Sequence, residues 1–407
     1  MGRIERYYVS SNILDAFSGR AVSLITQIVV VNQLGFTGTE LGILGSLPII
    51  LYLVSAVPIG KFVDSLKPVT VLSCGLSVKA FLLVIFTFLY ISDGLSFLTI
   101  LVLQVFQSLV GIFIDNSQII TAVSIQKSVE DSKLVARLES ADKAVGIAAP
   151  GVVALIAAGE FYKAGYIASS LTAVCALLMV VFPVRKAVRR VKDMGVEDNR
   201  KQDADTGGEK ALLGGFRLIA QDKERLIPVL LIASGNFGLA FIDSPRSLFL
   251  LREIGMAPSG FSMLNIVNAV AGLSAAVLVV PLIDRFDFMK MTVLAAFGQV
   301  LSTLFFLAVV VFHLPAFIFM AISGSLWSAA VALINVAAMN FFVSKLPQNQ
   351  IGVGLSSMRV SVMAVVPLGA FLGGFSAEYF GYAFSSIVWT AVAAVAFFIG
   401  LGQVLKR

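Results

Sequence analysis

Long apolar segments recur along the chain with short polar breaks, and they predict a series of membrane-crossing helices. About 20 apolar residues span a bilayer as a helix, and each segment comes near that length or exceeds it. Runs that alternate apolar and polar residues are absent, so a membrane β-barrel is not indicated. The predicted spans are 11–34, 40–63, 69–91, 96–124, 143–159, 164–183, 226–250, 260–283, 291–312, 316–343, 351–375 and 383–404. The pattern predicts an all-α polytopic membrane protein with twelve transmembrane helices, arranged as two six-helix parallel repeats.

Composition supports a membrane location and excludes other classes of protein. Hydrophobic residues make up 58% of the 407 residues and charged residues 13%, which is about half the charged share of a soluble domain. A cytosolic globular enzyme and a disordered regulator are therefore excluded. Cys74, Cys175 and the single His313 are too few for a thiol or imidazole metal site, and no phosphate-binding glycine loop is present. We expect no enzymatic activity, no cofactor and no metal.

Lysine and arginine residues are divided unevenly between the two sets of predicted loops. Most of the 30 basic residues lie at the termini, in 185–225 and in the other loops of that side, whereas the opposite loops hold only Lys163 and Arg252. The positive-inside rule then places both termini and the 185–225 linker in the cytoplasm. We expect a multi-pass protein of the cell (plasma) membrane. The net charge of +6 follows from this bias, so nucleic-acid binding is not indicated.

The two halves of the chain repeat weakly. The separation from Gly35 to Asp64 equals that from Gly255 to Asp284, and both acids lie at the end of the second span of their half. These matches predict an N-terminal six-helix bundle over 1–184, a cytoplasmic linker over 185–225 and a C-terminal six-helix bundle over 226–407. The segment 210–225 predicts a helix along the membrane surface, because its apolar residues share one face. They are Leu212, Leu213, Phe216 and Ile219.

The loop Gly60–Lys67 resembles the signature of the major facilitator superfamily, in which a glycine precedes an aspartate and basic residues. Pro281–Arg285 echoes it in the second half, and Ser65 stands where the family usually has arginine. The resemblance implies alternating access between two six-helix halves, with a gate near the cytoplasmic helix ends. The gate residues that we predict are Asp64, Lys67, Asp142, Asp284 and Arg285.

Three shorter patches resemble the macrolide-efflux and siderophore-exporter branch of that superfamily. They are Gly19–Ile25 in the first span, Gly214–Ile219 ahead of the seventh, and Ala149–Gly151 in the fifth. The resemblance implies export of an organic compound.

Ionisable residues inside predicted spans are costly in lipid, so each is a functional candidate. Polar stripes at helical spacing, such as Asn12-Asp15-Gly19, predict that the first, fourth and seventh spans face a central cavity. The candidates for proton coupling and for the cavity are Asp15, Arg20, Lys79, Gln107, Asp115, Asn236, Asp243, Arg246, Trp327, Asn335 and Arg359.

Structural alternatives stay open for several of these residues. Asp15 and Asp115 can exchange protons, or form permanent salt bridges to Arg20 or Lys79. An ion pair of Lys79 with Asp15 or Asp115 is favoured over contact with substrate. Trp327 can stack a ligand or simply pack against its neighbours.

These features favour a secondary active transporter that uses the proton gradient to export an amphipathic organic compound. The expected partners are a small-molecule substrate, protons and membrane lipids. Two alternatives remain: a transporter of an anionic metabolite or siderophore, bound by Arg20, Lys79 or Arg359, and a lipid translocase. The sequence implies no oligomer.

Overall fold

The computed structural model describes residues 3–64, 66–129, 134–184, 208–283, 286–346 and 351–406, and every regular element in these ranges is a helix. The chain divides into two compact units. The first comprises Met1–Leu34 and Leu51–Asp205, and the second comprises Gly35–Ile50 and Thr206–Arg407. The first part of helix α2 (Gly38–Asp64) thus groups with the second unit, whereas its remainder groups with the first.

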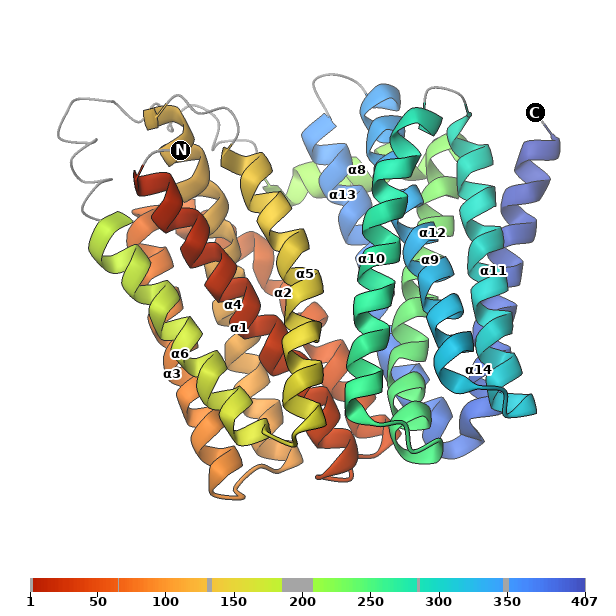
Figure 1. Ribbon diagram of the computed structural model, residues 1–407. Helices are drawn as coiled ribbons and strands as arrows, with labels where there is room; N and C mark the ends of the chain where they lie inside the picture. Colours follow the sequence, from red (N-terminus) through yellow and green to blue (C-terminus); the bar gives the residue numbers. More distant parts are fainter. Residues whose placement is uncertain are drawn as a thin grey trace. The chain divides into compact units, whose positions relative to one another are not determined.

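In the first unit, α1 packs against α5 and α6, while α3 packs against α4 and α6 (Figure 1). Its core includes Tyr8, Leu72, Leu76 and Ile125, all nearly inaccessible to solvent. The helices are α1 (Arg3–Asn32), α3 (Pro68–Ile91), α4 (Phe97–Val129), α5 (Leu134–Ala158) and α6 (Tyr162–Met179), which the π-helix η1 (Val180–Val184) continues.

In the second unit, α14 packs against α9 and α11, while α12 packs against α10 and α11. The helices are α8 (Gly208–Ala220), α9 (Lys223–Leu248) with the π-helix η3 (Phe249–Glu253), α10 (Pro258–Ile283), α11 (Phe288–Phe312), α12 (Ala316–Lys345), α13 (Ile351–Met363) and α14 (Val366–Leu405). Phe342 is fully buried in a core cluster of this unit.

Most helices are apolar around much of their circumference, which suits a lipid environment because a helix satisfies its own backbone hydrogen bonds. Among the described residues, 11 helical stretches are long and apolar enough to cross a membrane. The last of them, Gly354–Leu405, covers most of the predicted span 351–375 and all of the predicted span 383–404. The prediction of an all-α polytopic membrane protein is confirmed.

The prediction of one continuous helix over 351–375 is wrong. Helix α13 ends at Met363, and α14 begins at Val366 with Pro367 in its first turn. Proline lacks an amide donor, and its ring displaces the carbonyl four residues earlier. That carbonyl belongs to Met363, the last residue of α13.

Helix α14 is interrupted at Gly381, which has φ +81° and ψ 172°. This left-handed φ is strained for a residue with a Cβ atom, whereas glycine adopts it readily. The interruption falls in the break that the sequence predicts between 375 and 383.

Two helices begin earlier than the apolar pattern predicts. Helix α1 begins at Arg3 rather than 11, and α5 begins at Leu134 rather than 143. The extra turns carry charged residues, of which Glu5 is only 1% exposed and pairs with Arg137 of α5 at 3.5 Å. Apolar segments mark the part of a helix inside the hydrocarbon, so they do not mark its polar ends.

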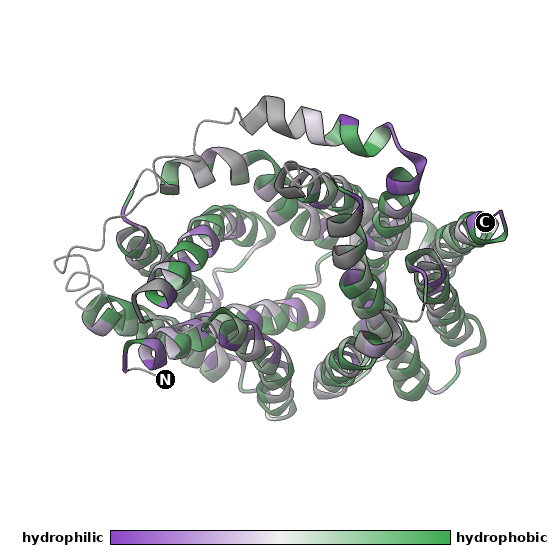
Figure 2. Ribbon diagram, turned by 90° about the horizontal axis from the view of Figure 1, so that it is seen from above, coloured by the Kyte–Doolittle hydropathy of each residue, from purple (hydrophilic) through white to green (hydrophobic). Residues whose placement is uncertain are grey.

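Helix α8 lies crosswise to the other helices of its unit (Figures 1 and 2) and packs on α13. It ends at Ala220 rather than continuing to 225. The connection between α8 and α9 ends at Asp222, which caps α9. Its Oδ1 accepts a hydrogen bond from the backbone amide of Glu224 at 2.9 Å. Ile219 is buried in the core, and the side chains of Leu212 and Leu213 are outside the described residues.

Candidate functional site

The first unit contains a cavity of about 450 Å³ between α1, α3, α4 and α5. Its wall combines charged and apolar side chains, and Asp15, Arg20, Lys79, Asp115 and Asp142 all line it. A volume of this size is typical of sites for small organic ligands. The charged residues predicted for the cavity of the first half, together with Asp142, are therefore gathered in one place.

Asp15 forms a buried ion pair with Lys79 inside this cavity. The Nζ of Lys79 lies 2.5 Å from Oδ1 of Asp15, and Gln118 donates to Oδ2 at 3.2 Å. Asp15 is 7% exposed. The sequence left two partners open for each of these residues, and in the structure Asp15 and Lys79 pair with each other. Lys79 and Gln118 together occupy both carboxylate oxygens of Asp15.

Arg20 pairs with Asp142 of α5, a partner that the sequence did not indicate. Its Nη2 donates to both carboxylate oxygens at 2.7 Å, and its Nη1 donates to the backbone carbonyl of Asp142 at 2.6 Å. A Cβ atom on Gly146 would lie 3.0 Å from Nη1. Gly146 therefore leaves the space in which the guanidinium reaches α5.

Asp115 differs from the other charged residues of the cavity. No hydrogen bond or ion pair joins its carboxylate to any residue in the described part of the chain. Glu139, which also lines the cavity, likewise has no such partner there. The charges cancel within each of the two pairs, Asp15–Lys79 and Arg20–Asp142. The carboxylates of Asp115 and Glu139 remain, so the cavity carries a net negative charge.

Such an arrangement can attract a cation or hold a proton, because unpaired carboxylates set the sign of the local field. It does not resemble a metal centre. In the ranges that the structure describes, no three His, Cys, Asp or Glu residues are grouped closely enough to hold a metal ion.

The candidates of the second half are more dispersed. Asn236 donates to the carbonyl of Val362 at 3.0 Å, and thereby joins α9 to α13. Asp243 and Arg246 pair along α9 at 3.4 Å. Asn335 and Arg359 are exposed.

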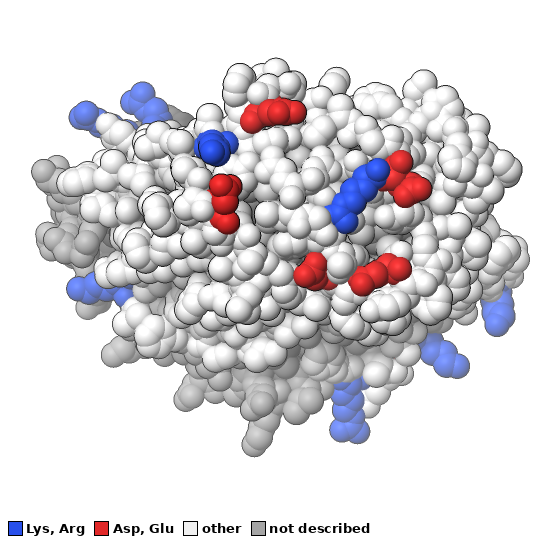
Figure 3. Space-filling model, turned by 90° about the horizontal axis from the view of Figure 1, so that it is seen from below, with Lys and Arg blue, Asp and Glu red and all other residues white. Residues whose placement is uncertain are grey.

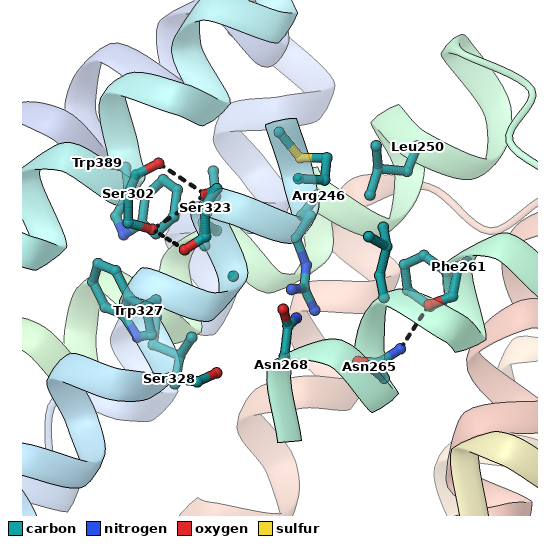
Figure 4. A pocket seen from close by; sticks show the side chains of 15 residues that line it. Arg246, Leu250, Phe261, Asn265, Asn268, Ser302, Ser323, Trp327, Ser328 and Trp389 are labelled. Carbon is teal, nitrogen blue, oxygen red and sulfur yellow. Dashed lines mark hydrogen bonds between the residues drawn. The ribbon is translucent and has the colours of Figure 1, made fainter. Parts of the chain in front are cut away.

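A smaller pocket of about 70 Å³ lies in the second unit between α9, α10, α11, α12 and α14 (Figure 4). Arg246 and Trp327, both predicted from sequence, line it together with Asn268 and Trp389. Asn335, which the sequence groups with Trp327, is not among its lining residues.

The remaining predicted residues lie elsewhere. Gln107 is in α4, and its buried Nε2 has no hydrogen-bond partner in the described structure. Lys67 is exposed and immediately precedes α3. Asp64 is the last residue of α2, but its side chain lies outside the described residues, as do Asp284 and Arg285 altogether.

Sequence reasoning missed Glu139 and Trp389. Glu139 lies one helical turn before Asp142, so the predicted start of the span at 143 left it in a loop. Trp389 lies in α14 and contacts Trp327 with ring centroids 4.9 Å apart. Trp327 and Trp389 are the two tryptophans of the chain, which is a signal that could have linked them.

Comparison with known proteins places this architecture in a family. The sequence profile described as Major Facilitator Superfamily matches residues 9–246. No curated protein matches the chain.

Solved structures share its fold. The nucleoside transporter NupG, solved as a mutant, has a TM-score of 0.77 at 12% identity, covering 98% of this chain and 99% of that one. A bacterial homologue of the iron transporter ferroportin, in an inward-facing state, has a TM-score of 0.72 at 15% identity, covering 98% of each chain. A D-xylose-proton symporter has a TM-score of 0.69 at 13% identity, covering 98% of this chain and 96% of that one. At these identities the likeness concerns the fold alone.

Proposed function

We propose that this chain, which belongs to the Major Facilitator Superfamily of membrane transporters, is a proton-coupled exporter of cationic amphipathic organic compounds. The observation that carries the proposal is the unpaired carboxylate of Asp115 in a cavity where acids outnumber bases. Membership in this family makes the chain a multi-pass transporter rather than an enzyme. The substrate, the coupling ion and the direction of transport are our proposal.

The walls of the first-unit cavity support an amphipathic cation. Ile13, Ile119, Val135 and Leu138 provide apolar surface beside the carboxylates. A hydrophobic cation would bury its apolar part against these side chains and bring its charge to Asp115. The mixture also agrees with the resemblance to the macrolide-efflux and siderophore-exporter branch.

Proton coupling would follow from competition for the same carboxylate. When Asp115 is ionised it attracts the cation, and when it is protonated the attraction is lost, so proton and substrate exclude each other. Asp15 is less suited to this role because Lys79 and Gln118 occupy its oxygens. It would instead hold α1 to α3 and α4 while Asp115 exchanges its proton.

The position of the cavity supports loading from the cytoplasm. Glu139 and Asp142 lie in the first half of α5, and Asp115 lies in the second half of α4. The first residues of α5 and the last residues of α4 belong to the same end of the first unit. Arg20 and Lys79 lie near the middle of α1 and α3. The excess of basic residues at that end favours a cytoplasmic location for it by the positive-inside rule. The loops at the opposite end of this unit carry Asp93 and Glu160. In the view from below, acidic side chains lie on the face itself, whereas most of the basic side chains lie at its rim (Figure 3).

An anionic substrate has less support from the geometry. Arg20 and Lys79, which would bind it, are already engaged by Asp142 and Asp15. Arg359 is exposed on α13 and belongs to neither cavity described above. The lipid translocase has no specific observation in its favour.

Transport in proteoliposomes tests the proposal. Ethidium, a permanent cation that a pH gradient does not trap passively, should accumulate in vesicles with an acidic lumen, whereas carboxyfluorescein should not. Asp115→Asn should abolish gradient-driven uptake, because an amide neither binds nor releases the coupling proton near neutral pH. Asp93→Asn is the matched control, because it changes a loop acid outside the cavity. Uptake that ignores the gradient, or that prefers the anion, would refute the proposal.

The proposed orientation has its own test. Reporter fusions after Lys406 or within the 185–225 linker should register as cytoplasmic. An extracytoplasmic signal at either place would invert the proposed direction of loading.

A further inference from the structure

The second-unit pocket shown in Figure 4 holds an unusual concentration of unsatisfied polar atoms. Buried side-chain atoms without a hydrogen-bond partner in the described structure include Nε of Arg246, Oδ1 of Asn268 and Nε1 of both Trp327 and Trp389. All four residues line this one pocket. The two tryptophans are only 5% and 4% exposed. A buried polar atom without a partner destabilises the folded protein, so the gathering of four such atoms indicates a site whose partner comes from outside the protein.

Arg246 and Asn268 show which kind of group would fit. Their polar ends point toward one another in Figure 4, yet neither Nε of Arg246 nor Oδ1 of Asn268 has a hydrogen-bond partner in the structure. A donor and an acceptor that face a common space suit a hydroxyl group. A hydroxyl accepts from a guanidinium through its oxygen and donates its own hydrogen to an amide oxygen.

Charge in the pocket does not favour an ionic ligand. The carboxylate of Asp243 lies 3.4 Å from Nη2 of Arg246 and offsets its positive charge, so the pair attracts neither an anion nor a cation strongly. Ser302 and Ser323, which also line the pocket, satisfy each other through a pair of hydrogen bonds. The remaining polar groups are therefore best matched by an uncharged ligand.

The walls favour a ring. Trp327 and Trp389 lie 4.9 Å apart between ring centroids at 40°, and Leu250 and Phe261 add apolar surface. The volume of about 70 Å³ is roughly five times what a single water needs. This leaves room for a small ring with a few substituents, whose C–H face would rest on indole while its hydroxyls reach Arg246 and Asn268.

We propose that this pocket binds an uncharged hydroxylated ring of the sugar type, with Arg246 and Asn268 as its hydroxyl ligands and the two tryptophans as its apolar wall. The site goes beyond the proposed export of cations, since it lies in the other unit and uses none of the same residues.

The tryptophans provide a direct test, because the chain contains only these two and all tryptophan emission therefore reports on this pocket. The purified full-length protein, in a detergent without a sugar headgroup, is titrated with D-xylose and D-glucose, and separately with choline and acetate. The sugars should change the emission saturably, whereas the two ions should not. Unchanged emission with both sugars at their highest soluble concentration, or a saturable response to either ion in place of the sugars, overturns the proposal.

Variants locate the effect. Asn268→Leu should weaken the sugar response about tenfold or more, since it removes a buried hydrogen-bond partner. Asn116→Leu is the matched control, because Asn116 is a helix amide of the first unit that bonds only to its own helix at Ile112. An undiminished response in Asn268→Leu overturns the site. If that variant does not fold, the wild-type titration still decides the question, and its outcome is independent of ethidium transport.

Discussion

The two cavities of this protein differ in how their polar groups are satisfied. In the first unit, Asp15–Lys79 and Arg20–Asp142 are closed ion pairs, and the unpaired groups are the carboxylates of Asp115 and Glu139. In the second-unit pocket, one arginine is balanced locally, and the unpaired groups are amide, guanidinium and indole atoms. Two units built from similar sets of helices therefore offer different chemistry: a charged cavity suited to cations and protons, and a neutral aromatic pocket suited to hydroxyls.

The comparison also separates groups that stabilise the fold from groups that are available to a ligand. Polar atoms that are paired within the protein contribute to stability, whereas buried polar atoms without partners reduce it until a ligand arrives. Substitutions in the two units should therefore change stability in opposite directions, and the following predictions use that difference.

The largest effect is expected at the buried ion pair. Asp15→Asn leaves the ammonium of Lys79 without its carboxylate, so the free energy of unfolding should fall by about 3 kcal/mol. Thermal unfolding in detergent measures this. Adding Lys79→Met should recover much of the loss, because the buried charge is removed as well. A double variant no more stable than Asp15→Asn alone would show that the pair is not what holds α1 to α3.

A smaller loss is expected from Gly146→Ala. The new Cβ would press against Nη1 of Arg20 at 3.0 Å and loosen the contacts with Asp142, at a cost of about 1 kcal/mol. Gly111→Ala is the control, since no atom lies within 4 Å of the Cβ it would add. Equal melting temperatures for the two variants would mean that the guanidinium shifts freely, and that Gly146 is not needed for the pair.

The second-unit pocket should respond with the opposite sign. Asn268→Leu replaces an unpaired buried amide by an apolar side chain of similar size, so the unliganded protein should gain about 1 kcal/mol of stability. The same change should weaken the sugar response about tenfold or more, a trade of function against stability. A loss of stability measured by thermal unfolding would mean that the amide is satisfied within the protein, and the contrast between the units would fail.

The smallest effect concerns Asp222, outside both cavities. The backbone amide of Glu224 and the side chain of Arg225 hold the pKa of Asp222 below its usual value. Its contribution to stability is therefore present above the ordinary pKa of an aspartate, near 3.9, and is lost as the pH falls through the lower value of the folded state. Asp222→Ala should cost about 0.5–1 kcal/mol at neutral pH, a modest figure because the group is partly exposed. Denaturation followed at pH 7 and at pH 3 checks that the cost shrinks in acid.

Much of the fold could be predicted from the sequence, because the apolar segments by themselves mark where helices cross a membrane. The errors occurred where local chemistry overrides that signal. Pro367 divides the predicted helix 351–375, and the charged first turns of α1 and α5 extend beyond their apolar segments. The six-and-six domain boundaries at 184 and 226 stay a prediction, and the grouping of Gly35–Ile50 with the second unit was not foreseen.

The sequence by itself determined which charges are exceptional, since Asp15, Arg20, Lys79 and Asp115 stand out in apolar segments whatever their partners are. It could not determine the partners. Lys79 lies 64 residues from Asp15, and Arg20 lies 122 residues from Asp142, so each pairing depends on how packed helices are rotated about their axes. The meeting of Arg246, Asn268, Trp327 and Trp389 was likewise decided only by tertiary structure, because these residues come from four helices and share no pattern in the sequence. Periodicity fixes what a single helix presents on its faces, and only packing decides which faces meet.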